Sequence, residues 1–407
     1  DRGIYLEERT KALLVGVNLN NDPEFETALK ELESLAEACN MEVVGVETQN
    51  VSQINTGVYV GTGRVEEIKA VAHMMGAEVI IFDNTLSPMQ LRNLKDIIER
   101  PVFDRTHLIL QIFSSRARTR EAQIQVETAR LQYELPRLTG MGEILSRQGG
   151  GSGGLSNKGA GEKKLELDKR KIRHRISELK KELREVEKNR ETQRKRRLVQ
   201  GIPQVALVGY TNAGKSTLLN RLTDAGVLSE DKLFATLDPT TRALKLANGE
   251  KVLLTDTVGF IRKLPHNLIE AFRSTLEEAK YADMIVHVVD CSNDDYERHM
   301  ATVYDTLKQL DVGDKPVITL FNKCDEFDEI PILKDSKADY VENISAKTGM
   351  GLDNFLMDIQ DIILKSRIQI ERVFPYNEAG KLQLIREYGQ LESEEYTPVS
   401  YTHLRAH

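Results

Sequence analysis

The sequence predicts a multidomain α/β protein, and three observations lead to this prediction. The chain has 407 residues, more than a single hydrophobic core usually organises. Two stretches alternate apolar runs with helical patterns, as parallel sheets with crossover helices do. Between these stretches lie two narrow heptad seams separated by glycines, which predict an antiparallel helical hairpin with a Gly-rich tip.

The composition is that of a soluble globular protein. Hydrophobic residues make up 40% and charged residues 29%, which excludes a mostly disordered or fibrous chain. No run of 18 apolar residues predicts a membrane span, and the first residues do not form a signal peptide. Peripheral membrane association stays open. The three cysteines lie far apart in sequence, so we expect reduced core residues and a cytoplasmic location.

Residues 1–116 are predicted to form an N-terminal parallel α/β domain. Apolar runs predict four strands, at 12–17, 41–46, 77–83 and 107–113. Apolar spacings of three and four predict helices between them, at 24–39, 64–75 and 88–99. The Gly61–Arg64 turn opens one of these helices; it is interpreted as a tight turn, with a phosphate-binding turn as the alternative.

Residues 117–200 are predicted to form the helical hairpin, with a Gly-rich loop at 148–161. One seam follows Ile124, Thr128, Leu131, Leu135 and Leu138, and the other follows Leu165, Ile172, Ile176, Leu179, Leu183 and Val186. Residues 151–200 contain 17 Lys and Arg against 8 Asp and Glu, although the whole chain has a net charge of −7. This basic segment favours a polyphosphate partner, with a solvated helix or a plain linker as alternatives.

A phosphate-binding loop follows an apolar strand and precedes a helical pattern. The segment matches G-x-x-x-x-G-K-[ST] in the order strand, loop, helix that this motif requires. Lys215 is predicted to contact the β- and γ-phosphates, and the Ser216 hydroxyl is predicted to bind Mg²⁺. The predicted contact residues are Gly209, Tyr210, Thr211, Asn212, Ala213, Gly214, Lys215, Ser216 and Thr217.

The base specificity is predicted by N-K-x-D at the end of a later strand. The Asp325 carboxylate can accept two hydrogen bonds from guanine, which adenine cannot donate in that geometry. Asn322 is predicted to meet guanine N7 and to tie back to the phosphate loop, and Lys323 to cover the ring. A following S-A-K segment, Ser345, Ala346 and Lys347, adds a backbone N–H at Ala346 for guanine O6. The predicted substrate is therefore GTP and the product GDP.

Two further segments complete the predicted site. Asp256, Thr257, Val258 and Gly259 end a strand; Asp256 would hold Mg²⁺ and the Gly259 N–H would sense the γ-phosphate. Phe234, Ala235 and Thr236 lie in an earlier loop, in which Thr236 is the first choice for the Mg²⁺ hydroxyl and Thr240 the second. The predicted metal ligands are Ser216, Thr236 and Asp256, and the predicted catalytic residues are Lys215, Thr236 and Gly259.

These motifs define a Ras-like P-loop GTPase domain at residues 201–366. Phe260 stands where many GTPases have a water-orienting Gln, so we expect slow intrinsic hydrolysis. Asn212 raises the hypothesis that K⁺ stimulates turnover. Residues 367–399 are interpreted as a truncated small C-terminal α/β region, and residues 400–407 as a non-native tail.

Several long strings in this chain resemble the HflX GTPases, in the Obg–HflX branch of the P-loop GTPases. They are Asp256–Ala279, Ile81–Leu94, Phe103–Leu138 and the Gly-rich loop with the helix that follows it. The resemblance implies a GTP-hydrolysing factor that binds the 50S ribosomal subunit, ribosomal RNA and the 70S ribosome. It also implies the splitting or rescue of stalled ribosomes under stress. Some members hydrolyse ATP through the N-terminal domain, but here only the Gly61–Arg64 turn is a candidate for that.

Two other functions stay open at the level of sequence. One is an RNA-binding scaffold in which GTP is a structural ligand, and the other is a regulatory GTPase that acts on a protein partner. Lys215, Ser216 and Asp256 favour hydrolysis over a structural nucleotide, and the basic hairpin favours an RNA partner. We expect a monomer.

Overall fold

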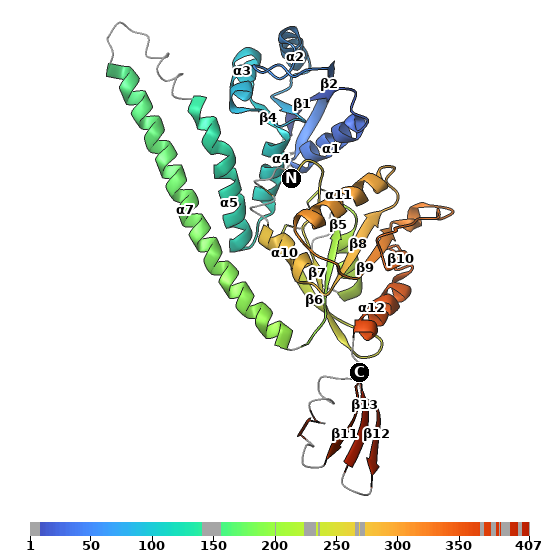
Figure 1. Cartoon of the computed structure of the whole chain (residues 1–407). Coiled ribbons are helices and arrows are strands. Elements are labelled where there is room, and N and C mark those ends of the chain that lie inside the picture. Colours follow the sequence, from blue (N-terminus) through green and yellow to red (C-terminus); the bar gives the residue numbers. More distant parts are fainter. Residues whose placement is uncertain are drawn as a thin grey trace, which may run out of the picture.

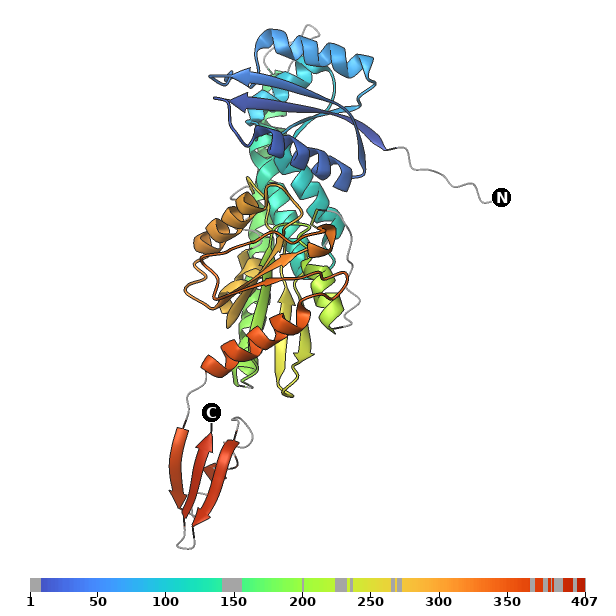
Figure 2. The ribbon, with the colours of Figure 1, turned by 90° about the vertical axis from the view of Figure 1, so that its right-hand side faces the viewer.

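The computed structural model is elongated and has four parts (Figure 1, Figure 2). An N-terminal α/β domain lies beside the G domain, a long two-helix arm runs along both, and a small sheet follows at the C-terminal end. The structure describes residues 9–140, 156–199, 201–223, 233–234, 237–264, 268, 273–366, 370–375, 380–381, 383, 391–397 and 401–406.

The N-terminal domain is a four-stranded parallel sheet with the order β2-β1-β3-β4. Its buried face residues include Leu13, Leu14 and Ile81, which are apolar because helices cover both sides of a parallel sheet. The predicted parallel α/β fold is therefore confirmed. The elements in chain order are β1 (Thr10–Leu19), α1 (Phe25–Ala38), β2 (Met41–Val51), α2 (Thr62–Met74), β3 (Val79–Phe82), α3 (Pro88–Ile98) and β4 (Val102–Asp104).

The prediction of a strand at 107–113 is wrong, because these residues lie in helix α4 (Arg105–Arg116). The Asp104 carboxylate caps this helix by accepting a hydrogen bond from the His107 N–H at 3.0 Å. The helix packs between α1 and α5 (Arg120–Glu134), so that it is apolar on most sides. A continuous apolar run of this kind does not distinguish a buried helix from a buried strand. The fourth strand is the short β4 instead.

The arm is an antiparallel pair formed by α5 and α7 (Ser156–Val199), with a short 3-10 helix η1 (Leu135–Gly140) after α5. Arg120 pairs with Glu182 at 2.8 Å, and Glu127 pairs with Arg175 at 2.9 Å. A later residue of α5 thus pairs with an earlier residue of α7, as in an antiparallel pair. This register confirms the predicted hairpin. Leu179 of the predicted seam is fully buried, and the other five seam residues of α7 are half-buried.

The Gly-rich loop is shorter than predicted, because residues 156–161 belong to α7. The glycines in this stretch predicted a loop, since glycine disfavours a helix. Adding a residue to an existing helix avoids the cost of nucleation, however, and α7 has 44 residues. Residues 148–155 of the predicted loop lie outside the described residues.

The G domain is a six-stranded sheet with the order β10-β9-β8-β5-β7-β6, in which only β6 is antiparallel to its neighbour. Helices α10 and α11 cover one face, and α8 and α12 the other. The elements are β5 (Gln204–Gly209), α8 (Lys215–Thr223), β6 (Thr240–Lys245), β7 (Lys251–Asp256), α10 (Arg273–Tyr281), β8 (Met284–Asp290), α11 (Tyr296–Gln309), β9 (Val317–Asn322), the 3-10 helix η2 (Cys324–Glu326), β10 (Tyr340–Asn343) and α12 (Leu352–Ser366).

The described C-terminal strands are β11 (Ile370–Pro375), β12 (Leu391–Thr397) and β13 (Tyr401–Ala406), in an antiparallel sheet with the order β11-β13-β12. The predicted α/β region thus contributes a small antiparallel sheet, with residues of the predicted tail in its central strand. No helix in the described part of the chain is both long and apolar enough to cross a membrane.

Candidate nucleotide-binding site

The predicted phosphate loop lies between β5 and α8, at the carboxyl edge of the G-domain sheet. Two glycines are required by close contacts. A Cβ on Gly209 would lie 2.3 Å from the Val288 carbonyl oxygen, and a Cβ on Gly214 would lie 2.2 Å from Asn322 Nδ2. Gly214 also has a φ of +96°, in the region that favours glycine. The loop can therefore hold its backbone N–H groups toward a phosphate.

Lys215 is buried at the start of α8, and its ammonium group is held by the loop itself. Nζ donates to the Gly209 carbonyl at 3.2 Å and to the Tyr210 carbonyl at 2.9 Å. Burial lowers the pKa of Lys215 to about 8, and the nearby Asp256 carboxylate acts in the opposite direction. A phosphate would stabilise the charged form in this desolvated position. The geometry fits the predicted role of Lys215.

The described metal-ligand candidates lie together. Ser216 Oγ donates to Asp256 Oδ2 at 2.6 Å, and Asp256 is fully buried at the end of β7. A hydroxyl and a carboxylate are the hard oxygen donors that Mg²⁺ prefers, so this donor set fits the ion. Thr240 begins β6 and pairs in register with Asp256. Thr236 and Ala235 lie outside the described residues.

The three segments predicted to bind the base are joined by one side chain. Asn322 Nδ2 donates to the Ala213 carbonyl at 2.9 Å, and Asn322 Oδ1 accepts from the Ala346 N–H at 2.9 Å. The predicted tie to the phosphate loop is therefore present. The Ala346 N–H, predicted to meet guanine O6, has a protein acceptor here. Ser345 is buried and its hydroxyl accepts from the Thr348 N–H at 3.0 Å, which shapes the loop, while Lys347 is exposed.

Lys323 and Asp325 project from the end of β9. Lys323 adopts a left-handed backbone with a φ of +68°, and its ammonium pairs with Asp290 at 2.7 Å. Asp325 is exposed on η2, where its carboxylate is accessible to a base. The structure also brings together two cysteines that the sequence separates: Cys291 Sγ lies 3.6 Å from Cys324 Sγ, and both are free thiols.

The segment that begins at Asp256 returns to the phosphate loop. The Thr211 N–H donates to the Phe260 carbonyl at 2.8 Å, and a Cβ on Gly259 would lie 2.7 Å from Thr211 Cα. Phe260 is buried in the core, so it cannot orient a water. Thr257 and Val258, predicted as nucleotide contacts, direct their side chains into the protein; Thr257 Oγ1 donates to the Leu207 carbonyl at 2.7 Å.

The N-terminal domain contacts this site directly, which the sequence did not predict. The Tyr210 hydroxyl bonds to Glu31 of α1 and accepts from the Arg262 N–H at 3.0 Å. The Tyr210 ring stacks on His299 with centroids 3.8 Å apart. Burial and Glu31 raise the pKa of Tyr210, so this hydroxyl stays protonated.

Ion pairs extend this contact along the segment after Gly259. Arg262 pairs with Glu24, and Lys263 pairs with Asp83 at 3.1 Å. Asp83 also pairs with the buried Arg105 at 3.0 Å. The Arg262–Glu24 and Lys263–Asp83 pairs join residues 238 and 180 positions apart in the chain, and no local motif marks them. The segment after Gly259, the residue predicted to sense the γ-phosphate, is therefore in direct contact with the N-terminal domain.

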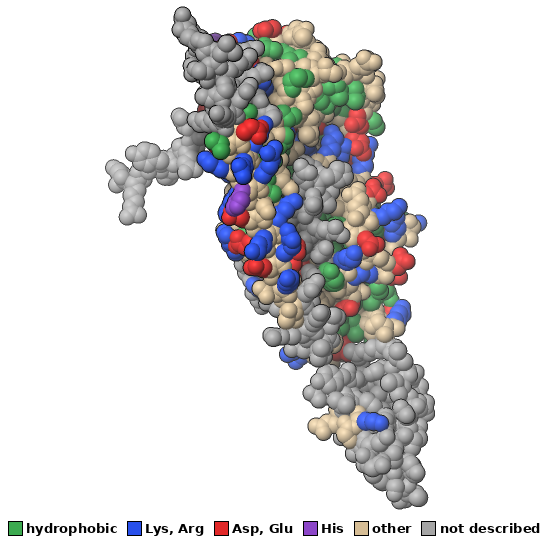
Figure 3. Space-filling view, turned by 60° about the vertical axis from the view of Figure 1, so that its left-hand side comes forward, with side chains coloured by type: hydrophobic (Ala, Val, Ile, Leu, Met, Phe, Trp, Pro, Cys, Tyr) green, Lys and Arg blue, Asp and Glu red, His purple; other side chains and the backbone are tan. Residues whose placement is uncertain are grey.

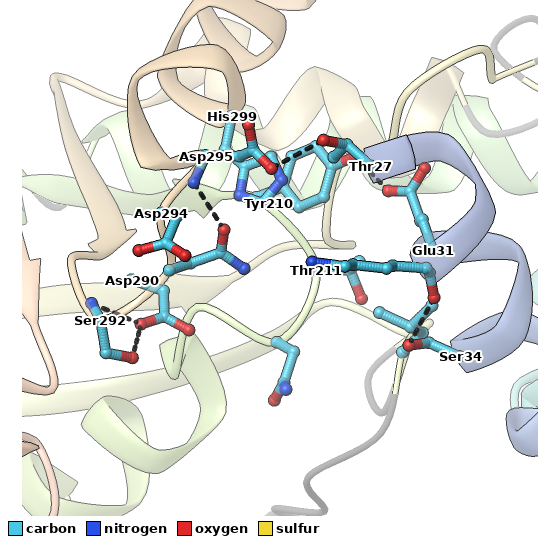
Figure 4. Close-up of a pocket in the computed structure, with 14 residues that line it drawn as sticks. Thr27, Glu31, Ser34, Tyr210, Thr211, Asp290, Ser292, Asp294, Asp295 and His299 are labelled. Carbon is cyan, nitrogen blue, oxygen red and sulfur yellow. Dashed lines mark hydrogen bonds between the residues drawn. The ribbon is translucent and has the colours of Figure 1, made fainter. Parts of the chain in front are cut away.

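A cavity of about 380 Å³ lies between α1 and the phosphate loop (Figure 4). Glu31 and Ser34 of α1 face Thr211 across it, and Asp290, Ser292 and Asp294 line the opposite wall (Figure 4). Thr27 Oγ1 donates to Asp295 Oδ2 at 2.8 Å and closes one end of the cavity. The nucleotide site is thus bordered by both domains.

Three family models match consecutive parts of the chain. "GTP-binding GTPase N-terminal" matches residues 26–114, "GTP-binding GTPase Middle Region" matches 116–197, and "50S ribosome-binding GTPase" matches 204–323. The last of these contains the phosphate loop and reaches Lys323 of the base motif.

Similar proteins cover most of this chain. The GTPase HflX of Lacrimispora saccharolytica is 53% identical over 391 residues, which is 96% of this chain and 91% of that protein. The GTPase HflX of Escherichia coli K12 is 41% identical, with 84% and 80% covered. A GTP-binding protein from Sulfolobus solfataricus, solved with GDP, is 25% identical, with 88% and 100% covered and a TM-score of 0.46. Because the chain is 53% identical to a GTPase HflX over 96% of its own length, it belongs to the HflX family of GTPases.

Proposed function

We propose that this GTPase binds the large ribosomal subunit and splits or rescues stalled ribosomes under stress. The observation that supports the proposal is the set of exposed basic residues on α7, in a chain that also carries the GTP-binding motifs. Eight described basic residues on this helix are exposed, and one of them, Arg175, pairs with Glu127. They are Arg170, Lys171, Arg173, Arg175, Lys180, Lys181, Arg184 and Lys188. Figure 3 shows Lys and Arg side chains along this surface, interspersed with acidic ones.

In this proposal the nucleotide site binds the phosphates and the base of GTP and stabilises the charge that develops during hydrolysis. Lys215 and the phosphate-loop N–H groups would bind the β- and γ-phosphates, while Asp325 selects guanine. Ser216 and Asp256 would hold Mg²⁺, with Thr236 or Thr240 as the third protein ligand. Bound Mg²⁺ would neutralise the negative charge that accumulates on the phosphate oxygens during transfer. The Gly259 N–H would donate a hydrogen bond to the γ-phosphate, so its position would depend on whether GTP or GDP is bound.

Phe260 supports the proposal of slow intrinsic hydrolysis. Its side chain is buried and cannot position the attacking water, so another group has to complete the site. We propose the ribosome as the source of this stimulation. K⁺ near Asn212 is a second candidate, because the side-chain carbonyl oxygen of an Asn in the phosphate loop can be a ligand for K⁺. Equal GTP turnover in Na⁺ and K⁺ would rule out the ion.

The proposed ribosomal partners rest on the basic charge of the arm and on the family model that matches the G domain. The family model over the G domain is described as a 50S ribosome-binding GTPase. The basic arm offers a surface for ribosomal RNA, because Lys and Arg that neutralise RNA phosphates release counterions. We therefore propose binding to 50S subunits and 70S ribosomes by a cytoplasmic monomer, with the tip of the arm reaching the peptidyl-transferase region.

The proposal is tested by sedimentation of 70S ribosomes with this protein and GTP, GDP or a non-hydrolysable GTP analogue. We expect 50S and 30S peaks to grow at the expense of 70S with GTP, and to grow less with GDP. The matched control replaces residues 149–154 by a short turn, which should keep nucleotide binding and lose splitting. A 70S peak that stays unchanged under all three nucleotides would refute the splitting function.

A further inference from the structure

We propose that Asp238 is a positioning residue that couples the nucleotide site to the arm. This inference rests on the proposed function and deepens it, because it names the contact through which GTP would control the RNA-binding helices. Asp238 lies in the loop between Phe234 and β6, which contains the predicted Mg²⁺ hydroxyl. Its carboxylate holds the first residues of α5, the first helix of the arm.

The contact has three hydrogen bonds from adjacent groups. Asp238 Oδ2 accepts from the Arg118 N–H at 3.0 Å and from the Thr119 N–H at 3.2 Å. Asp238 Oδ1 accepts from the Thr119 hydroxyl. A carboxylate at this place also interacts favourably with the positive end of the helix dipole. The G domain therefore binds the arm at the point where α5 begins.

Helix α5 does not need Asp238 in order to form its cap. Thr119 is itself the N-cap residue, and its Oγ1 accepts from the Ala122 N–H at 3.2 Å. Asp238 binds the N–H groups and the hydroxyl hydrogen that this cap leaves available. The Asp238 contact is thus an additional link between domains, and its removal should leave the secondary structure of α5 intact.

Both ends of the loop that contains Asp238 are held at the nucleotide site. On one side, the Phe234 N–H donates to Thr211 Oγ1 of the phosphate loop at 2.7 Å. On the other side, Thr240 pairs in register with Asp256, a predicted Mg²⁺ ligand. Asp238 is two residues from Thr240, a reach of at most about 7 Å. A movement of Thr240 would therefore be felt within two residues at Asp238.

Buried apolar contacts also join the loop that contains Asp238 to the helices next to the arm. The Phe234 ring meets Phe113 of α4 edge to face, with centroids 4.7 Å apart. Leu237, next to Asp238, is buried in the same cluster. Because Phe113 is only six residues before Thr119, the loop contacts the α4–α5 junction at two places. A nucleotide-dependent shift of Phe234, Leu237 or Asp238 would therefore move the start of α5 or break its contact with the G domain.

The first test compares Asp238→Ala with wild type in GTP hydrolysis titrated with purified 50S subunits. We expect the stimulated kcat of the variant to fall about tenfold, while its GTP affinity without ribosomes stays nearly unchanged. Asp238→Asn, which keeps one acceptor oxygen, should lie between the two. Thr119→Ser keeps the hydroxyl and should behave as wild type. Asp305→Ala removes an exposed carboxylate elsewhere in the G domain and controls for charge.

The second test measures the arm itself by distances between spin labels at Leu167→Cys and Lys308→Cys, both exposed in the structure. The unsubstituted chain controls for labelling of the three native cysteines. We expect the distance to change between GDP and a non-hydrolysable GTP analogue, and we expect Asp238→Ala to abolish that change. An equal change in both proteins would overturn the inference, whatever the ribosome assays give.

The two tests separate failure of this inference from failure of the proposed function. If 50S subunits stimulate wild type and Asp238→Ala equally, the coupling role is refuted and ribosome binding stands. If 50S subunits fail to stimulate even wild type, the proposed function fails, and the spin-label distances alone decide whether Asp238 couples the site to the arm.

Discussion

At the scale of residues, the guanine contact is the sharpest claim, because it depends on one carboxylate. Asp325 is exposed at the end of β9, next to Asn322, which joins the phosphate loop to the Ala346 loop. The geometry leaves the Asp325 oxygens available to two base N–H donors. An adenine in the same position would leave the carboxylate without these bonds.

Asp325→Asn should change base preference from guanine to xanthine, because the amide can donate to xanthine O2. Loss of two charge-assisted bonds should weaken GTP binding by roughly 3 kcal/mol, or about 100-fold. Competition binding with GTP and XTP measures both. Asp328→Asn, a nearby exposed substitution, should change neither affinity. If Asp325→Asn kept the wild-type preference for GTP, the base site would have to lie elsewhere.

His287 gives a pH dependence whose sign can be worked out. Burial in β8 lowers its pKa to about 4, and the Nδ1 atom has no hydrogen-bond partner among the described residues. In the unfolded chain the imidazole of His287 is protonated as the pH falls through about 6.5, whereas in the folded chain it stays neutral until the pH is near 4. Stability from this group is therefore complete above pH 6.5 and is lost as the pH falls toward 4.

Between pH 6.5 and 4, His287 should lower the free energy of unfolding by roughly 3 kcal/mol. His287→Leu removes the titrating group at similar volume, so its unfolding midpoint in urea should depend less on pH over this range. Parallel urea titrations of both proteins at pH 7, 5.5 and 4.5 measure the difference. Identical pH profiles would mean that His287 titrates normally in the fold.

The motif residues could be predicted from sequence because each motif is a local backbone structure. Gly214, Lys215 and Ser216 lie within one turn, and their spacing is fixed by the loop that they form. The contacts of Glu31 with Tyr210 and of Asp238 with Thr119 join residues 179 and 119 positions apart. No periodicity relates such residues, so these parts of the site could only be found in the structure.

At the scale of elements, α4 and α7 show where sequence patterns fail. Helix α4 is buried on most sides, so its sequence lacks the polar stripe by which an amphipathic helix is recognised. The start of α7 contains two glycines, which predicted a loop in spite of the long helix that follows. The elements predicted well, α1 and α3, have a buried and an exposed face.

The arm depends on its apolar seam more than on its surface ion pairs. Leu179 is fully buried between α5 and α7, so Leu179→Ala should destabilise the arm by about 2–5 kcal/mol. Hydrogen exchange of the α5 and α7 amides measures this locally. Leu167→Ala, at a residue that is 56% exposed, should change exchange little. Similar exchange rates in both variants would mean that the seam does not hold the helices together.

At the scale of the whole molecule, the sequence indicated separate domains but not their contacts. The basic segment predicted an arm with its own charge. The structure shows that arm as an antiparallel pair that contacts α4 of the N-terminal domain through α5, and the G domain through α7. Arg190 of α7 pairs with Glu121 of α5 at 3.1 Å and with Glu278 of α10 at 3.7 Å. Domain contacts depend on surfaces assembled from distant segments, so one sequence cannot reveal them.

The central claim is that one guanine nucleotide pocket controls a basic arm that engages the ribosome. Steady-state GTP hydrolysis with and without purified 50S subunits tests it most directly. We expect a low rate without ribosomes, a clear rise with 50S subunits, and loss of that rise when Lys180, Lys181 and Arg184 are changed to Glu. A rate that 50S subunits leave unchanged would refute control of the arm by the nucleotide pocket.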